Sequence, residues 1–257
     1  MRKSFIALWT VAVLFAALLF SGSAFAAHPL ITDDTGTQGK KKYQIEVNGQ
    51  YGQDKSEGVT QNSTQLATGL AYGITDNLDI SIGVPYLSLR TKTADGSITD
   101  QGVSDVSVGL KWRFYEHDNF SLSLKPAVTL PSGDEDKGLG TGRATYSLYL
   151  ILTKEIAPLV FHLNLGYIRN ENKLDQVQDL WHASLASEYK IVKDLKAVIN
   201  FGMQRNTSKL SGTHPAFVLG GLIYSISENF DFDIGYKYGL NNDEIDHTGL
   251  VGLTFKF

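Results

Sequence analysis

VSDVSVGLKWRFY, residues 103–115, is the stretch that decides the fold. From Val106 to Phe114 every second residue is apolar, and the residues between them are small or charged. Side chains on a β-strand point alternately to its two faces, so the segment predicts a strand with one apolar and one polar face. A soluble sandwich would also alternate in this way, so the length of the strands and the rhythm of the connections have to decide.

Twelve segments share this pattern, and each runs to about 11 residues, against about 5–6 for a strand in a globular protein. A tilted strand needs about 9–11 residues to cross a bilayer. The predicted strands are 43–53, 63–74, 78–89, 103–115, 120–130, 143–154, 159–170, 179–190, 195–205, 214–226, 230–240 and 247–257.

The connections alternate between short and long. Tight turns are predicted at 75–77, 116–119, 155–158, 191–194 and 227–229, and polar loops at 54–62, 90–102, 131–142, 171–178, 206–213 and 241–246. Short turns at one rim and longer loops at the other are typical of outer-membrane barrels, whose short turns face the periplasm. An even number of strands then places both termini at the rim with the short turns.

Composition agrees with an exported all-β chain. There are 25 glycines, 12 tyrosines, 13 phenylalanines and no cysteine, so disulfides cannot support a weak core. Lys plus Arg number 23 against 27 Asp plus Glu, a balance that gives no indication of a nucleic-acid partner.

The first 26 residues have the features of a cleaved signal peptide. Arg2 and Lys3 precede an apolar run, and Ala24-Phe25-Ala26 has the small-residue spacing of a peptidase site. The mature chain is expected to begin at Ala27 or His28. Residues 27–42 are then either a periplasmic tail, the favoured interpretation, or a plug of the lumen, and residues 43–257 form the barrel.

These observations predict an all-β, transmembrane, antiparallel up-and-down β-barrel of about 12 strands in the outer membrane of a Gram-negative bacterium, with its apolar face on lipid. The closing residues GLVGLTFKF resemble the C-terminal signal of bacterial outer-membrane proteins, in which apolar residues alternate up to a final aromatic. That resemblance implies recognition by the barrel-assembly machinery through Leu253, Phe255 and Phe257.

A second resemblance covers most of the mature chain. Residues 28–39 (HPLITDDTGTQG), 43–49, the turn YGITDNLD at 72–79, 102–106 and 125–133 resemble a group of outer-membrane transporters of the MetA pathway of phenol degradation. The resemblance implies transport of aromatic or other hydrophobic compounds, and it carries no agreed site residues.

The polar face of the strands is expected to line the lumen. It would either select solutes as a channel lining or form a packed network of ion pairs that fills the interior. Charges near the strand ends, at Asp79, Asp105 and Asp231, are expected to be structural. The lining candidates are Glu46, Lys111, Arg113, Lys125, Arg143, His162, His182, Glu188, Asp233 and Lys237.

Catalysis is not expected. No G-x-S-x-G or comparable nucleophile motif accompanies the six histidines, and no H-x-x-x-H pair is present. The acidic run Asp134-Glu135-Asp136 is interpreted as a solvated loop tip, so no metal and no cofactor are expected.

Three functions remain open at this point. The leading one is a channel for passive uptake of small solutes, including hydrophobic or aromatic ones. A structural or adhesive barrel with a closed lumen is the alternative, and a barrel hydrolase comes third.

Overall fold

The computed structural model of the chain describes residues 28–56 and 58–257. The predicted signal peptide, residues 1–26, lies outside the described residues. Among the described residues, no helix combines the length and the apolar character needed to cross a membrane.

The chain forms strands joined in sequence order, with one short 3-10 turn, η1, at Glu135–Lys137. The strands are β1 (Tyr43–Ser56), β2 (Val59–Thr75), β3 (Leu78–Thr93), β4 (Gly96–Val103), β5 (Val106–His117), β6 (Phe120–Leu130), β7 (Thr145–Ile156), β8 (Leu159–Arg169), β9 (Asp179–Val192), β10 (Leu195–Gln204), β11 (Ala216–Ser227), β12 (Phe230–Gly239) and β13 (His247–Lys256).

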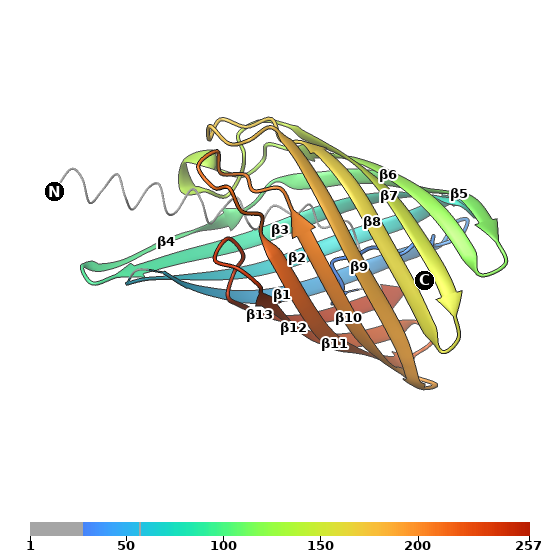
Figure 1. The fold of residues 1–257 in the computed structure, drawn as a ribbon. Coiled ribbons are helices and arrows are strands. Elements are labelled where there is room, and N and C mark those ends of the chain that lie inside the picture. Colours follow the sequence, from blue (N-terminus) through green and yellow to red (C-terminus); the bar gives the residue numbers. More distant parts are fainter. Residues whose placement is uncertain (1–27, 57) are drawn as a thin grey trace.

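Twelve of these strands close into an antiparallel barrel, which confirms the predicted fold (Figure 1). The ring closes where β1 pairs with β13, from Gln44 opposite Lys256 to Gln53 opposite His247. Strand β4 lies outside the ring and pairs with the far half of β3, while β5 pairs with the near half. Every strand of the ring therefore has two neighbours, and the backbone of the closed wall is hydrogen-bonded throughout.

Two predicted loops are wrong. Residues 54–56 and 59–62 belong to β1 and β2, which pair up to Ser56 opposite Val59, and residues 90–102 contain the end of β3 and all but the last residue of β4. Both stretches are polar, which led to a loop prediction, yet they keep enough β-branched residues to pair as strands. The two hairpins extend beyond the rim of the barrel (Figure 1). Two predicted strand starts also shift, from 143 to Thr145 and from 214 to Ala216.

The outer face of the barrel is apolar. The exposed side chains include Leu66, Leu70, Ile80, Ile82, Val84, Leu148, Leu165, Leu185, Ile199, Phe201, Leu222, Ile234 and Val251. Exposed aromatics border this belt at both rims: Tyr43, Tyr72, Trp112, Phe114, Tyr189, Tyr224 and Phe257 at one, Tyr51, Tyr146, Tyr167, Trp181, Tyr236 and Tyr238 at the other. An apolar belt between two aromatic girdles is the surface that a bilayer requires.

The two rims differ as predicted. One, the turn rim, carries two-residue connections such as Asp76–Asn77 and both ends of the barrel chain. The opposite loop rim carries the longer connections and the two hairpins. Asp105 fixes the 131–144 loop there by accepting hydrogen bonds from the N–H of Gly133 (2.9 Å) and of Thr141 (2.8 Å).

Glycines on the inner face make room for large side chains, and one of them provides a test. A Cβ added at Gly166 would lie 2.4 Å from Cε1 of the buried Tyr149, whereas one added at the outward-facing Gly220 would meet nothing within 4 Å. We expect Gly166→Val to destabilise the barrel by about 1–3 kcal/mol through overpacking. Gly220→Val serves as the control and is expected to change stability little. Urea unfolding of the refolded protein in lipid vesicles measures both, and equal effects would contradict the assignment of inner and outer faces.

Candidate functional site

The N-terminal segment, residues 28–42, lies inside the ring and bonds to inward-facing wall residues, so the lumen plug describes it better than the periplasmic tail that the sequence favoured. At the turn rim it pairs briefly with β2, because the N–H of Lys41 donates to the carbonyl of Gly73 (2.8 Å) and the N–H of Gly73 donates to the carbonyl of Lys42 (2.8 Å). A Cβ at Gly73 would lie 1.8 Å from the carbonyl oxygen of Gly39. Only glycine at this position lets the segment pass so close to the wall.

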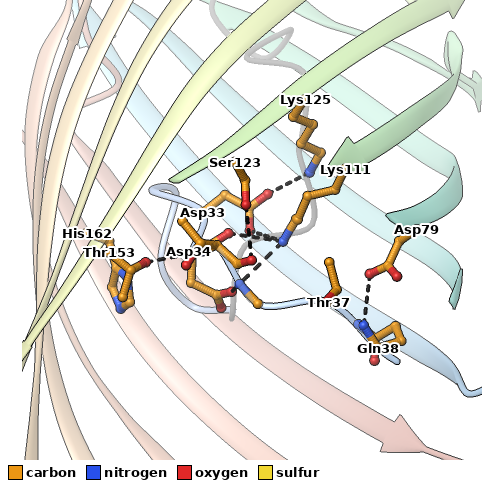
Figure 2. A network of polar contacts seen from close by, with 12 residues as sticks. Asp33, Asp34, Thr37, Gln38, Asp79, Lys111, Ser123, Lys125, Thr153 and His162 are labelled. Atoms are coloured by element: carbon orange, nitrogen blue, oxygen red, sulfur yellow. Dashed lines mark hydrogen bonds and ion pairs between the residues drawn. The ribbon is translucent and has the colours of Figure 1, made fainter. Parts of the chain in front are cut away.

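Asp33 is the centre of the contact between the segment and the wall (Figure 2). Its Oδ1 accepts a hydrogen bond from Nζ of Lys111 on β5 (2.8 Å), and its Oδ2 accepts one from Nζ of Lys125 on β6 (2.7 Å). The Asp33 side chain is 0% exposed, and those of Lys111 and Lys125 are 12% and 4% exposed. Two cations from adjacent strands thus hold the two oxygens of one carboxylate.

Neutral side chains bind the backbone on both sides of Asp33. Oδ1 of Asn200 accepts from the N–H of Ile31 (2.8 Å) and of Thr32 (3.0 Å). The side-chain amide of Asn164, in its flipped orientation, bonds to both backbone groups of Asp33. Its oxygen accepts from the N–H (2.7 Å), and its nitrogen donates to the carbonyl (2.9 Å). These bonds satisfy backbone groups that would otherwise be buried without partners.

The segment continues this pattern towards the turn rim. The N–H of Thr35 donates to Oγ1 of Thr153 on β7 (3.1 Å), and the hydroxyl of Ser123 on β6 donates to the carbonyl of Thr35 (3.1 Å). The N–H of Gln38 donates to Oδ2 of Asp79 on β3 (2.9 Å). The predicted structural role of Asp79 therefore includes an anchor for the segment.

Apolar packing completes the contact on the opposite wall. Leu30 is buried in a cluster with Ala186, Val198 and Ile223, from β9, β10 and β11. Ile31 packs against a second cluster of Phe217, Leu219 and Leu250. At the first residue of the segment, Nδ1 of His28 is 2.5 Å from Oδ1 of Asp233 on β12. A segment of fifteen residues thus contacts the wall from β2 round to β12.

A cavity of about 620 Å³ remains between the segment and the wall at the turn rim. Polar and charged side chains line it, among them Asp34, Asp79, Lys111, Lys125, Glu188 and Lys196. The cavity reaches both lysines that hold Asp33, so the central ion pairs border a polar space.

Four of the predicted lining residues lie in or beside this network. Lys111 and Lys125 bind Asp33, and Asp233 binds His28. Glu46 is buried nearby, where its oxygens accept from Nε2 of Gln44 (2.6 Å) and Nδ2 of Asn48 (3.1 Å).

Four further candidates pair with residues outside the segment. Nε2 of His162 lies 3.5 Å from Oε1 of Glu188, whose Oε2 accepts from Lys196 (2.8 Å). Nε2 of His182 lies 3.0 Å from Oγ of Ser184, and Nζ of Lys237 donates to Oε1 of Glu244 (2.7 Å) near the loop rim.

Two candidates lie away from the central lumen. Arg113 is at the turn rim, with Nε 3.2 Å from Oε2 of Glu116. Arg143 precedes β7 in the loop at the opposite rim, where its side chain is 57% exposed and its closest acid is Glu171, at 4.0 Å. The alternation of apolar and polar residues in 143–154 predicted a strand from residue 143, but β7 starts two residues later, at Thr145.

The residues that sequence reasoning missed are those of the segment itself, Asp33 above all, and the neutral wall residues Asn164 and Asn200. One signal was present. Lys111 and Lys125 face inward on adjacent strands, and a short tail with Asp33-Asp34 was the nearest source of a matching charge.

One arrangement resembles a catalytic triad in outline. Oγ1 of Thr153 lies 2.9 Å from Nδ1 of His162, whose Nε2 faces Glu188. The Thr153 hydroxyl, however, already accepts the N–H of Thr35 and is buried beneath the segment. In this structure the arrangement therefore contributes to the packing of the segment. No group of three or more His, Asp or Glu that could hold a metal occurs among the described residues.

Comparison with known proteins agrees with the fold. The family model described as "Putative MetA-pathway of phenol degradation" matches residues 26–257. No match occurs among curated proteins. Among solved structures, the KdgM porin is 12% identical with a TM-score of 0.56, and covers 83% of this chain and 99% of its own.

Two other barrels are similar to the same degree. The NanC porin is 14% identical with a TM-score of 0.54, over 83% of this chain and 100% of its own. The translocator domain of the autotransporter NalP from Neisseria meningitidis is 10% identical with a TM-score of 0.55, over 100% of this chain and 98% of its own. These likenesses show an outer-membrane barrel fold.

The ion pairs of Asp33 predict how the segment can be loosened. Lys125→Met leaves the Asp33 carboxylate with one lysine fewer in a buried site, and removal of one partner of a buried ion pair costs about 3–5 kcal/mol. We therefore expect faster amide hydrogen exchange over residues 29–38, with β9 to β12 unchanged. Lys237→Met, which removes a lysine paired with Glu244 instead, is the control. Unchanged exchange in the Lys125 variant would show that Asp33 does not hold the segment.

Proposed function

The chain belongs to the family described as "Putative MetA-pathway of phenol degradation", and we propose that it is an outer-membrane channel for the passive uptake of small solutes, hydrophobic and aromatic compounds among them. In this proposal the turn rim faces the periplasm and the loop rim faces the cell exterior, as in other barrels with short and long connections.

The observation that carries the proposal is the way in which the interior is filled. An eight-stranded barrel is filled by side chains of its own wall, and wider barrels leave space. Here the ring has twelve strands, and a separate segment takes up the space, leaving a cavity of about 620 Å³. A wall that encloses more room than its side chains fill supports a conducting barrel.

The segment sets the conductance in this proposal. Its bonds to the wall come from individual side chains, such as Asn200 and Lys125, rather than from a continuous strand ladder. The barrel wall does not depend on them, because the ring closes through β1 and β13. The segment can therefore shift while the wall stays intact.

The partners in this proposal are lipid around the apolar belt and the barrel-assembly machinery at the last strand. Phe255 stacks on Phe230 with ring centroids 4.6 Å apart, and Phe257 stacks on Tyr43 at 4.7 Å. Leu253 lies on the same outward face, opposite Phe232 and Val47. An aromatic C-terminal edge of this kind supports recognition before β13 meets β1.

The structural or adhesive alternative also has an observation in its favour. The β1–β2 and β3–β4 hairpins extend past the loop rim, and a barrel closed by the segment could present them to other surfaces (Figure 1). The two functions differ in conductance, because a purely structural barrel needs none.

Deletion of residues 29–38 tests the channel. In planar bilayers the refolded full mature chain is expected to conduct weakly, and the deletion variant to conduct several-fold more, because the lumen loses its occupant. Asn200→Ala, which removes three hydrogen bonds to the segment, is expected to give more frequent openings without the risk of a large deletion. No conductance from any of the three proteins would reject the channel in favour of the structural barrel.

A further inference from the structure

The two lysines that hold Asp33 form a clamp for a carboxylate. Each oxygen of the Asp33 carboxylate accepts a hydrogen bond from a different lysine, at 2.8 Å from Lys111 and at 2.7 Å from Lys125. Charge-assisted hydrogen bonds of this length are the strong ones in proteins, and two of them on one carboxylate also fix its orientation.

The clamp belongs to the wall, and its occupant does not. Lys111 and Lys125 project from β5 and β6, whose ladder is set by the barrel, whereas Asp33 comes from a segment without a strand ladder at that position. The two lysines therefore belong to the wall, and Asp33 belongs to the segment.

The other acids near the clamp have hydrogen-bond contacts of their own in this structure. Asp79 accepts the N–H of Gln38 through Oδ2, and Glu46 accepts from Gln44 and Asn48. Asp34 reaches Lys111 only at 3.9 Å, and it belongs to the same segment as Asp33. When the segment leaves, an anion that takes the place of Asp33 restores the charge-assisted hydrogen bonds that Lys111 and Lys125 made to it.

An anion can reach the clamp. The cavity of about 620 Å³ at the turn rim is lined by both lysines, and this volume is within the range of about 300–1,000 Å³ that small-molecule sites occupy.

We propose that Lys111 and Lys125 are a binding site for small monocarboxylate anions, and that Asp33 is a built-in competitor which such a solute displaces. The inference rests on the proposed channel and specifies one class of its solutes. Binding of the carboxylate and release of the segment are then one exchange, in which the clamp is never empty.

Calorimetric titration of the refolded full mature chain with benzoate tests the site without requiring conductance. We expect benzoate to bind, and benzamide, which has the same shape and no charge, not to bind. In Asp33→Asn the competitor loses its charge, so benzoate affinity should rise about tenfold. In Lys111→Met and Lys125→Met it should fall about tenfold, because one charge-assisted hydrogen bond is lost.

Asp34→Asn is the matched control. It removes the same charge from a carboxylate that accepts the N–H of Gly36 and lies 3.9 Å from Lys111, so benzoate affinity should rise much less than in Asp33→Asn. If Asp33→Asn does not refold, Asn200→Ala loosens the same segment without touching the lysines, and benzoate affinity must then rise.

The outcomes separate the two proposals. Benzoate binding that follows these variants, together with absent conductance, would reject the channel and keep the carboxylate site. Conductance with no benzoate binding, or with equal binding of benzamide, would overturn the site and leave the channel. Equal effects of Asp33→Asn and Asp34→Asn would also overturn it, because the competitor would then not be Asp33.

Discussion

The rest of the structure depends on closure of the backbone ladder between β1 and β13. Within hydrocarbon an unpaired N–H or C=O costs several kcal/mol, so a sheet can cross a bilayer only if it has no free edge. The pairing from Gln44–Lys256 to Gln53–His247 removes that edge. The outer face is then free to be apolar, and all polar side chains must turn inward or lie at the rims. Strand β4 can keep a free edge because it pairs with a different part of β3 from the part that pairs with β5. That edge belongs to the protruding hairpin.

Closure with twelve strands creates the second problem, which is an interior too wide for the wall to fill. Here the N-terminal segment provides the missing atoms. Its apolar residues, such as Leu30, pack on small and branched side chains of β9 to β11, and its polar backbone is matched by Asn200 and Thr153. The buried carboxylate of the segment, Asp33, forms ion pairs with two lysines of the wall. Unlike wall side chains, this filling is joined to the barrel at one end only, within the described chain.

That difference relates the filling of the interior to the proposed uptake. A lumen packed by wall side chains can open only if the wall deforms, whereas a lumen packed by a segment can open if the segment moves. Moving Asp33 alone would break its hydrogen bonds with Lys111 and Lys125, which opposes opening. A carboxylate solute removes that cost by taking the place of Asp33. Retention of the segment and selection of the solute would then depend on the same two ammonium groups.

The sequence by itself determined the class of fold, the number of strands in the ring and the face of each strand, because the two-residue period of a strand is local and the bilayer fixes its length. It placed Lys111, Lys125, His162 and Glu188 inside for the same reason. It did not determine that residues 54–62 and 90–102 would pair as hairpins, because polar stretches of strand and loop have similar composition. Above all, Asn200 lies 167 residues after Asp33 in the chain. It binds the backbone beside Asp33 only because the closed ring brings the two together. Contacts across a lumen have no period in the chain, and only the tertiary structure decided them.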